Sequence, residues 1–129
     1  KASSRVFLEQ YFLQSGITLT PEIELSSRSL LVSLAKIGLG VAGVTLEFVQ
    51  DALLSGDIRL LALDGVEPTR ETIRNGTYPI TETFYAVTAA PVGEPPLQER
   101  DPTAAAFLDW ILSDQGQQLI EQTGYVALE

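Results

Sequence analysis

The chain has 129 residues, of which 45% are hydrophobic, and its 17 acidic and 8 basic residues give a formal net charge of −9. This length suits a single globular domain, residues 1–129. The acidic balance argues against nucleic acid or an anionic membrane surface as a partner, because both are bound through basic patches. The sequence has no cysteine and no histidine, which removes disulfides, thiol nucleophiles, imidazole bases and soft metal ligands. We therefore expect no enzyme activity, no metal site and no cofactor.

The start of the sequence suggests a piece of a longer protein. It begins with Lys1 in place of Met and enters a helical pattern within a few residues. No signal peptide and no run of about 20 apolar residues is present. The lack of cysteine is compatible with an oxidising exterior as well as with the cytosol, so composition leaves the compartment open.

The first predicted helix begins at Ser3 or Ser4 and ends at Gly16. Its apolar residues recur at helical spacing: Val6, Phe7, Leu8, Tyr11, Phe12 and Leu13. Either serine can be a simple N-cap. The same residues also allow an anion site, because two hydroxyls, free backbone N–H groups and the Arg5 guanidinium converge at the positive end of a helix dipole.

A second hydroxyl-rich helix start follows. Residues 17–25 alternate well enough for a strand interrupted at Pro21, and Ser26-Ser27-Arg28-Ser29 then opens a helix that ends at Gly38. Ser26 and Ser27 are either a cap facing solvent or the rim of an anion site.

The next segments read as a strand, a short helix and another strand. Residues 38–46 are apolar and rich in glycine, which predicts a buried strand; they are no phosphate-binding Walker loop, since Gly-Lys-Ser/Thr is missing. Residues 47–54 predict a short helix and residues 58–63 the next strand.

The stretch from Ala62 to Pro91 combines a turn, a helix and a strand. Asp64-Gly65 is a turn signal, and Pro68 with Thr69 can open a helix that Asn75-Gly76 closes. Residues 80–88 are β-prone.

A polar loop over 92–102 leads to the last helix, residues 103–124. Thr103 is its predicted cap, Gly124 its predicted end, and Trp110 is expected in the core.

Alternating strands and helices of this length predict an α/β fold with a mostly parallel sheet flanked by helices. No internal repeat is apparent.

Two pieces of the sequence resemble a known family. Gly65 to Thr88, with its Pro-Thr, Asn-Gly-Thr-Tyr-Pro and Phe-Tyr-Ala-Val-Thr, is similar to the late section of the phosphate-binding proteins that feed ABC phosphate importers. Phe107 to Leu128 resembles the closing helix and tail of the same proteins. The resemblance implies one lobe, the second, of a bilobal periplasmic-binding-protein-like fold that closes on its ligand. It further implies phosphate or a related oxyanion as ligand, a missing first lobe and an ABC permease as partners, and an extracytoplasmic location, in the periplasm or as a cell-surface lipoprotein.

The resemblance also implies where the ligand binds. Such proteins carry a Ser-Gly-Thr/Ser-Arg loop at a helix start in their second lobe, and Ala2-Ser3-Ser4-Arg5 aligns with it. Ala2 stands where the pattern has a serine and Ser3 where it has glycine, so Ser3, Ser4 and Arg5 are the expected ligands, with Ser26 and Ser27 ranked below them. Glu82 falls where the family often has an arginine, so we expect a structural or hinge role for that turn.

Selectivity for phosphate over sulfate needs an acceptor for the proton that phosphate keeps at neutral pH. No carboxylate lies within residues 3–5, so by analogy the acceptor is expected in the missing lobe. The chain alone is then expected to bind phosphate weakly or not detectably.

The sequence allows two alternative functions, a ligand-sensing domain and an enzyme. Residues 21–55 resemble a section of the effector-sensing domains of LysR-type transcription regulators, which share the bilobal scaffold. An enzyme with a Ser-Lys dyad at Lys36 is disfavoured, because Lys36 is expected near a helix end with its ammonium in water. The pair Glu22/Glu24 is expected to be solvated.

Overall fold

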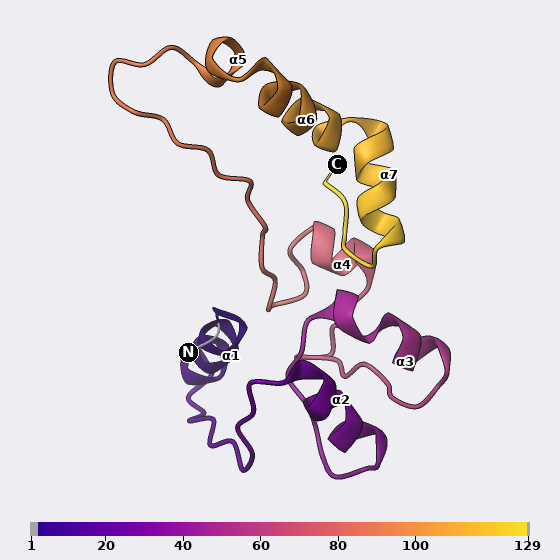
Figure 1. Cartoon of the computed structure of the whole chain (residues 1–129). Helices are drawn as coiled ribbons and strands as arrows, with labels where there is room; N and C mark the ends of the chain where they lie inside the picture. Colours follow the sequence, from indigo (N-terminus) through magenta and orange to yellow (C-terminus); the bar gives the residue numbers. More distant parts are fainter. Residues whose placement is uncertain (1–2, 129) are drawn as a thin grey trace. The chain divides into compact units, whose positions relative to one another are not determined.

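The computed structural model describes residues 3–128, and its backbone forms two compact units (Figure 1). Unit 1 comprises Lys1–Glu82 and unit 2 comprises Thr83–Glu129. In unit 1 the helical elements are α1 (Ser3–Gln14), α2 (Arg28–Lys36), the 3₁₀ helix η1 (Leu46–Val49), α3 (Gln50–Leu54) and α4 (Arg70–Arg74). In unit 2 they are α5 (Leu97–Arg100), α6 (Pro102–Leu112) and α7 (Asp114–Gln122).

Helix ends in unit 1 follow the local signals of the sequence. Ser27 is the N-cap of α2, and its Oγ accepts the Leu30 N–H at 3.3 Å. Thr69 caps α4 in a capping box with Thr72: each side chain accepts the backbone N–H of the other residue. Gly76 follows the C-cap of α4 at φ +72°, the left-handed conformation that glycine adopts without strain. The predicted helix start at Ser27 and the predicted helix from Thr69 to Gly76 are confirmed.

The Asp64-Gly65 turn is also confirmed. Both residues have positive φ, 50° and 78°, as a two-residue hairpin turn requires. Leu63 and Val66 exchange backbone hydrogen bonds of 3.0 and 2.9 Å across it. The Tyr11 hydroxyl of α1 donates to Asp64 Oδ2 at 2.5 Å, and this bond raises the pKa of Tyr11. The turn is therefore attached to α1.

The core of unit 1 is small. Val32 of α2, Val49 of η1 and Ala52 of α3 are buried together. Partly buried side chains pack against them: Val44, Leu46, Leu53 and Ile58. The core therefore joins α2 to the η1–α3 turn and to the segment that follows.

The predicted parallel sheet is wrong. Within residues 3–128 the β pairing consists of the isolated antiparallel bridge between Leu63 and Val66, and no strand is formed. The segments predicted as strands, residues 17–25, 38–46, 58–63 and 80–88, run between the helices without forming a sheet.

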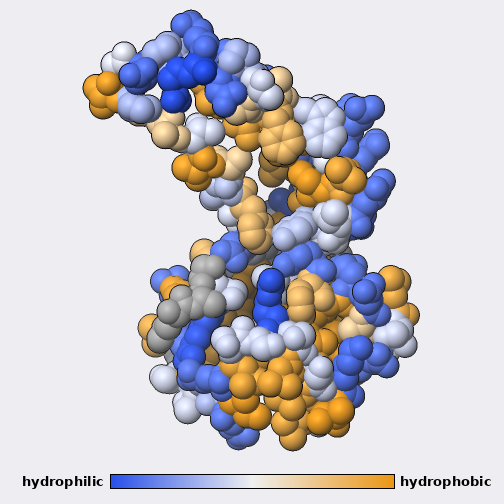
Figure 2. Space-filling view, viewed as in Figure 1, coloured by the Kyte–Doolittle hydropathy of each residue, from blue (hydrophilic) through white to orange (hydrophobic). Residues whose placement is uncertain are grey.

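The physical reason is the absence of lateral partners. A β-prone sequence is stabilised by cross-strand packing and by the ladder of hydrogen bonds, so its propensity has little effect without a neighbouring strand. The side chains show this directly, since Val41 is 81% exposed in the segment expected to be a buried strand, and Val87 is 87% exposed. Figure 2 shows such apolar side chains on the surface of the molecule.

Unit 2 is helical, and it differs from the prediction: α5 lies within the loop predicted over residues 92–102, and α6 begins at another N-cap than the predicted Thr103. Asp101, not Thr103, is the N-cap of α6: its Oδ1 accepts the Ala104 N–H at 2.9 Å, and Pro102 takes the first helical position. The run predicted as one helix over 103–124 is divided at Ser113, which ends α6 in an extended conformation and caps α7 through Gly116 N–H at 3.3 Å. Trp110 is 41% exposed and stacks on Phe107, so it does not lie in a core.

The tail of unit 2 is fixed by one amide side chain. Gln117 of α7 donates from Nε2 to the Ile111 carbonyl at 2.9 Å and accepts the Leu128 N–H on Oε1 at 2.7 Å. Gly116, beside it, is buried, and only glycine fits there, because an added Cβ would lie 2.3 Å from the Trp110 carbonyl oxygen. The two helices and the tail thus pack around the Ser113 break. No helix within residues 3–128 is both long and apolar enough to cross a membrane.

Candidate functional site

The Arg5 guanidinium is the centre of the best-defined charged cluster near the predicted site. Its Nε lies 2.6 Å from Glu9 Oε1, one helical turn along α1, and its Nη1 lies 2.5 Å from Glu24 Oε2. The two carboxylates raise the pKa of Arg5, Glu24 having the larger effect, so the guanidinium is a permanent cation. The Arg5 side chain is 30% exposed and remains accessible to solvent.

The Arg5–Glu24 pair connects α1 to the irregular segment that precedes α2. Glu24 lies two residues before Ser26, so this ion pair links α1 to the chain just before the second helix start. Without this ion pair nothing in the spacing of residues 5 and 24 would place them near each other.

Ser3 and Ser4 both lie at the start of α1, but only the side chain of Ser4 is among the described residues. Ser3 is the first residue of α1, but its side chain lies outside the described residues, as does Ala2. Ser4 is exposed in the first turn of α1. The first turn of this helix contains no acidic residue of its own, so no side chain within the turn opposes the positive end of the helix dipole.

Ser26 and Ser27 are both exposed at the start of α2. The Ser27 Oγ accepts the Leu30 N–H and lies 3.0 Å from the Ser29 Oγ. Ser27 thus performs the capping role, which leaves its hydroxyl proton to point to Ser29 or outward. Ser26 lies in a bend just before the cap.

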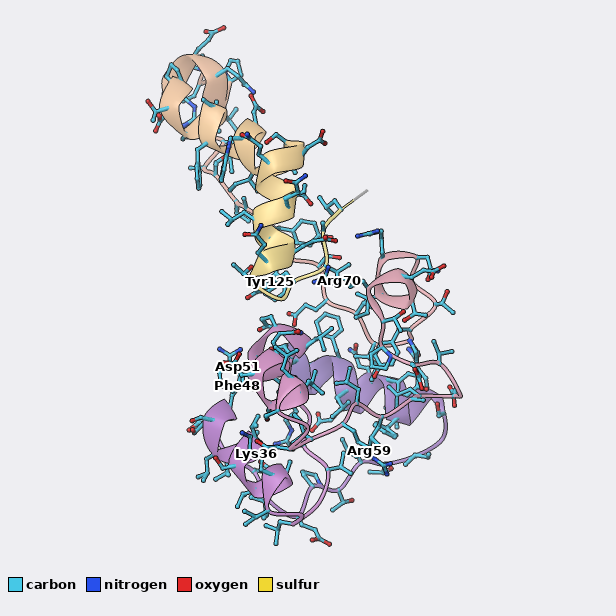
Figure 3. The ribbon with its side chains drawn as sticks, turned by 90° about the vertical axis from the view of Figure 1, so that its right-hand side faces the viewer. Lys36, Phe48, Asp51, Arg59, Arg70 and Tyr125 are labelled. Carbon is cyan, nitrogen blue, oxygen red and sulfur yellow. The ribbon has the colours of Figure 1, made fainter. Side chains whose placement is uncertain are left out.

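Sequence reasoning missed a second cationic group beside Ser27. Arg28 Nη1 lies 3.4 Å from Glu47 Oε1, and its Cζ lies 4.7 Å from the ring centroid of Phe48, labelled in Figure 3. Thr45 donates to the same Glu47 carboxylate at 2.6 Å. Arg28 therefore ties α2 to η1 by an ion pair and a cation–π contact. The only sequence signal for this arrangement was an arginine at the first turn of a predicted helix.

Lys36, also labelled in Figure 3, forms an ion pair with a carboxylate. Its Nζ lies 3.0 Å from Asp57 Oδ2, and Asp57 also accepts the Ser55 hydroxyl at 2.8 Å. This ammonium is thus paired with a carboxylate and not with a serine hydroxyl. Among residues 3–128 no group of three or more acidic, histidine or cysteine side chains is arranged to hold a metal ion.

Comparison with known proteins gives distant and partial similarities to phosphate-binding proteins. The chain is 33% identical over 76 residues to the phosphate-binding protein PstS 2 of Streptococcus agalactiae, a match that covers 59% of this chain and 24% of that protein. It is 26% identical over 123 residues to the phosphate-binding protein PstS of Borreliella burgdorferi, covering 94% of this chain and 39% of that one. For PstS of Pseudomonas aeruginosa the identity is 36% over 63 residues, covering 49% and 18%.

These similarities support the resemblance to phosphate-binding proteins that the two sequence pieces indicated. The chain spans well under half the length of the curated relatives it matches. No protein-family model matches the sequence. No solved structure matches it either.

Proposed function

We propose that this chain supplies part of the ligand site of a solute-binding component of an ABC importer, with inorganic phosphate or a related oxyanion as ligand. The observation that carries the proposal is the similarity to the Borreliella burgdorferi phosphate-binding protein, which extends over 94% of this chain. The proposed ligands are Ser3, Ser4 and Arg5, with Ser26 and Ser27 at the rim. The proposed partners are a first lobe that completes the site and an ABC permease, and the proposed location is extracytoplasmic.

The local geometry supports an anion at this place in three ways. Hydroxyls and backbone N–H groups at a helix N-terminus are uncharged donors suited to an anion, and no acidic residue belongs to the first turn of α1 itself. The Arg5 cation lies in the same turn and is 30% exposed. The Arg5–Glu24 ion pair links this turn to the segment that leads to Ser26 and Ser27.

The net charge of −9 does not prevent this function. Charges on the surface are screened beyond about 8 Å at physiological salt, so a local group of donors determines the affinity for a small anion. The relatives reported above are named as phosphate-binding proteins, which favours this function over a transcription regulator or an enzyme.

The test is a titration with phosphate and with sulfate, at constant ionic strength, followed by calorimetry and by backbone NMR shifts. It is made on the chain alone and on the chain mixed with the remaining part of its parent protein. We expect weak phosphate binding by the chain alone and tight, phosphate-selective binding by the mixture. Shifts should be confined to the first turn of α1 and to residues 26–27.

The variant Arg5→Gln should weaken phosphate binding about tenfold, because it removes a charged hydrogen-bond donor from the anion. Arg59→Gln is the matched control: Arg59, labelled in Figure 3, is an exposed arginine of the same unit, and this variant changes the net charge equally. Equal phosphate affinities of Arg5→Gln and Arg59→Gln would contradict the proposal that Arg5 binds the ligand. Absence of saturable phosphate binding in both the chain and the mixture would contradict the proposed phosphate-binding function. Micromolar binding by the chain alone would contradict the proposal that a second lobe is needed to complete the site.

A further inference from the structure

The sequence contains one asparagine, Asn75, and a glycine follows it. Asparagine is a chemically labile residue, because the backbone nitrogen of the next residue can attack its side-chain amide. Glycine is the most permissive neighbour for this attack, since it has no Cβ to hinder the nitrogen. Asn75 and Gly76 are both exposed at the end of α4 (Figure 1), so water reaches the pair.

The reaction of an Asn-Gly pair needs only water. A bond forms between the Gly76 nitrogen and Asn75 Cγ as the Cγ–Nδ2 bond breaks, and the proton of the Gly76 N–H leaves with the amide as ammonia. Water then opens the resulting succinimide ring at one of its two carbonyl carbons. Opening at Cγ gives aspartate, and opening at the backbone carbonyl gives isoaspartate, in which the main chain runs through Cβ. Either product has a carboxylate in place of the neutral amide.

The folded backbone holds Asn75 away from the reactive geometry. The succinimide ring is nearly flat, so Asn75 Cβ and the Gly76 nitrogen must eclipse each other about the Asn75 Cα–C bond. In the structure ψ of Asn75 is 1°, which eclipses the Gly76 nitrogen with the Asn75 nitrogen instead. Because the substituents of a tetrahedral carbon are evenly spread in this projection, Cβ lies about a third of a turn from the position that ring closure requires.

Hydrogen bonds around the end of α4 keep this backbone in place. The Asn75 N–H donates to the Glu71 carbonyl at 3.0 Å, and the Gly76 N–H donates to the Ile73 carbonyl at 3.3 Å. The Asn75 side chain is held as well, since its Oδ1 accepts the Thr77 N–H at 2.9 Å and the Thr77 hydroxyl at 2.5 Å. The attacking nitrogen and the amide are thus both engaged, and the reaction requires this turn to open.

Helix α4 can open without the exposure of a core. It comprises Arg70–Arg74, and none of these five described side chains is buried. Its start is fixed by the capping box of Thr69 and Thr72. Elements with few buried contacts open locally at a lower free energy than a core does.

From this geometry we propose that Asn75 is a deamidation site whose rate is set by opening of the C-terminal turn of α4. The closed turn protects Asn75, the open turn reacts, and the Thr77 hydroxyl keeps the turn closed. The isoaspartate product adds one carbon to the backbone inside the turn, so it favours the open state. This modification site is independent of the proposed phosphate-binding function.

The experiment follows deamidation of the full chain at mildly alkaline pH by mass spectrometry of the peptide that contains Asn75. The ratio of the rate in concentrated urea to the rate in buffer measures the protection, and it cancels the effect of neighbouring side chains on the intrinsic rate. We expect protection of about tenfold or more in the wild type. Thr69→Ala should lower it about fivefold, because α4 loses its N-cap.

Variants at Thr77 test the hydroxyl itself. Thr77→Ala should lower the protection about threefold, because one hydrogen bond is lost. Thr77→Ser keeps the hydroxyl and should retain the wild-type value. Thr81→Ala is the matched control, since Thr81 is an exposed threonine outside any helix, and it should also remain at the wild-type value. Circular dichroism checks that each variant is folded.

Several results would overturn the proposal. Equal rates in buffer and in urea for the wild type would show that the folded turn does not protect Asn75, and this comparison needs no variant. Equal protection in Thr77→Ala and the wild type would remove the role of the hydroxyl. Unchanged protection in Thr69→Ala would show that opening of α4 does not set the rate. Absence of aspartate and isoaspartate products in urea would remove the site.

Discussion

At the scale of single residues, the Asp57 carboxylate has the clearest electrostatic role outside the candidate site. It accepts the Ser55 hydroxyl at 2.8 Å and lies 3.0 Å from Lys36 Nζ. Both contacts favour the ionised form, so the pKa of Asp57 is lowered, first by the Ser55 hydrogen bond and then by Lys36. The carboxylate thereby connects the end of α2 to the turn after α3.

The lowered pKa of Asp57 predicts a pH-dependent contribution to stability. A carboxylate with a lower pKa in the folded state stabilises the fold above its unfolded pKa, about 3.9, and this stabilisation is lost as the pH falls through the folded pKa. Asp57→Asn should therefore lower the free energy of unfolding at pH 7, and the difference from wild type should shrink below about pH 4. Urea unfolding at several pH values measures it, with Glu22→Gln as the control. A difference that stays constant over that range would contradict the assignment.

The candidate site shows which residue contacts the sequence can predict. The contact of Arg5 with Glu9 follows from their spacing of four on a helix, so it could have been read from the sequence. The contact of Arg5 with Glu24 could not, because it joins a helix to an irregular segment 19 residues away in the chain. The hydroxyl-rich helix start at Ser27 was predictable because capping depends on three neighbouring residues.

At the scale of helices and turns, the N-cap of α6 is Asp101, whereas the sequence predicted Thr103. Asp101 accepts the Ala104 N–H, whereas Thr103 lies inside the helix. Asp101→Ala should lower the free energy of unfolding of unit 2 by about 1 kcal/mol, the usual value of an N-cap. Thr103→Ala is the matched control and should change it by less than about 0.5 kcal/mol. Thermal unfolding followed by circular dichroism compares them, and a larger loss for Thr103→Ala would restore Thr103 as the cap.

Several helix ends and turns were predictable from the sequence and the sheet was not, for one physical reason. Caps such as Thr69 and turns such as Asp64-Gly65 depend on contacts within about four residues, and the sequence displays those contacts directly. A strand depends on a distant partner, which no local pattern supplies. Residues 38–46 have the composition of a buried strand, yet Val41 is 81% exposed there. The α/β prediction failed at this step.

At the scale of the whole molecule, each unit is held by few buried side chains. Among the described residues the buried hydrophobic side chains are Val32, Val49, Ala52, Ala105 and Ala127. Most of these are small, and many large apolar side chains remain exposed. The secondary structure of each unit therefore depends strongly on local hydrogen bonds, and segments without such bonds should open first.

The extended segment at the start of unit 2 is therefore the predicted site of the first proteolytic cut. Tyr85 is 80% exposed and lies outside any helix, so its backbone can enter a protease cleft without unfolding an element. Chymotrypsin should cut at Tyr85 or at the neighbouring Phe84 before it cuts elsewhere, as measured by mass spectrometry over time.

Phe107 provides the internal comparison for this prediction. Its side chain is 58% exposed, close to the 64% of Phe84, but it lies within α6. If side-chain exposure alone decided cleavage, the two sites would be cut at similar rates; if backbone structure decides it, Phe84 and Tyr85 are cut first. The double variant Phe84→Thr/Tyr85→Thr should remove the early cut and leave the late pattern unchanged. An early cut at Phe107 in the wild type would show that α6 opens as readily as the extended segment, and would contradict the stability assigned to its Asp101 cap.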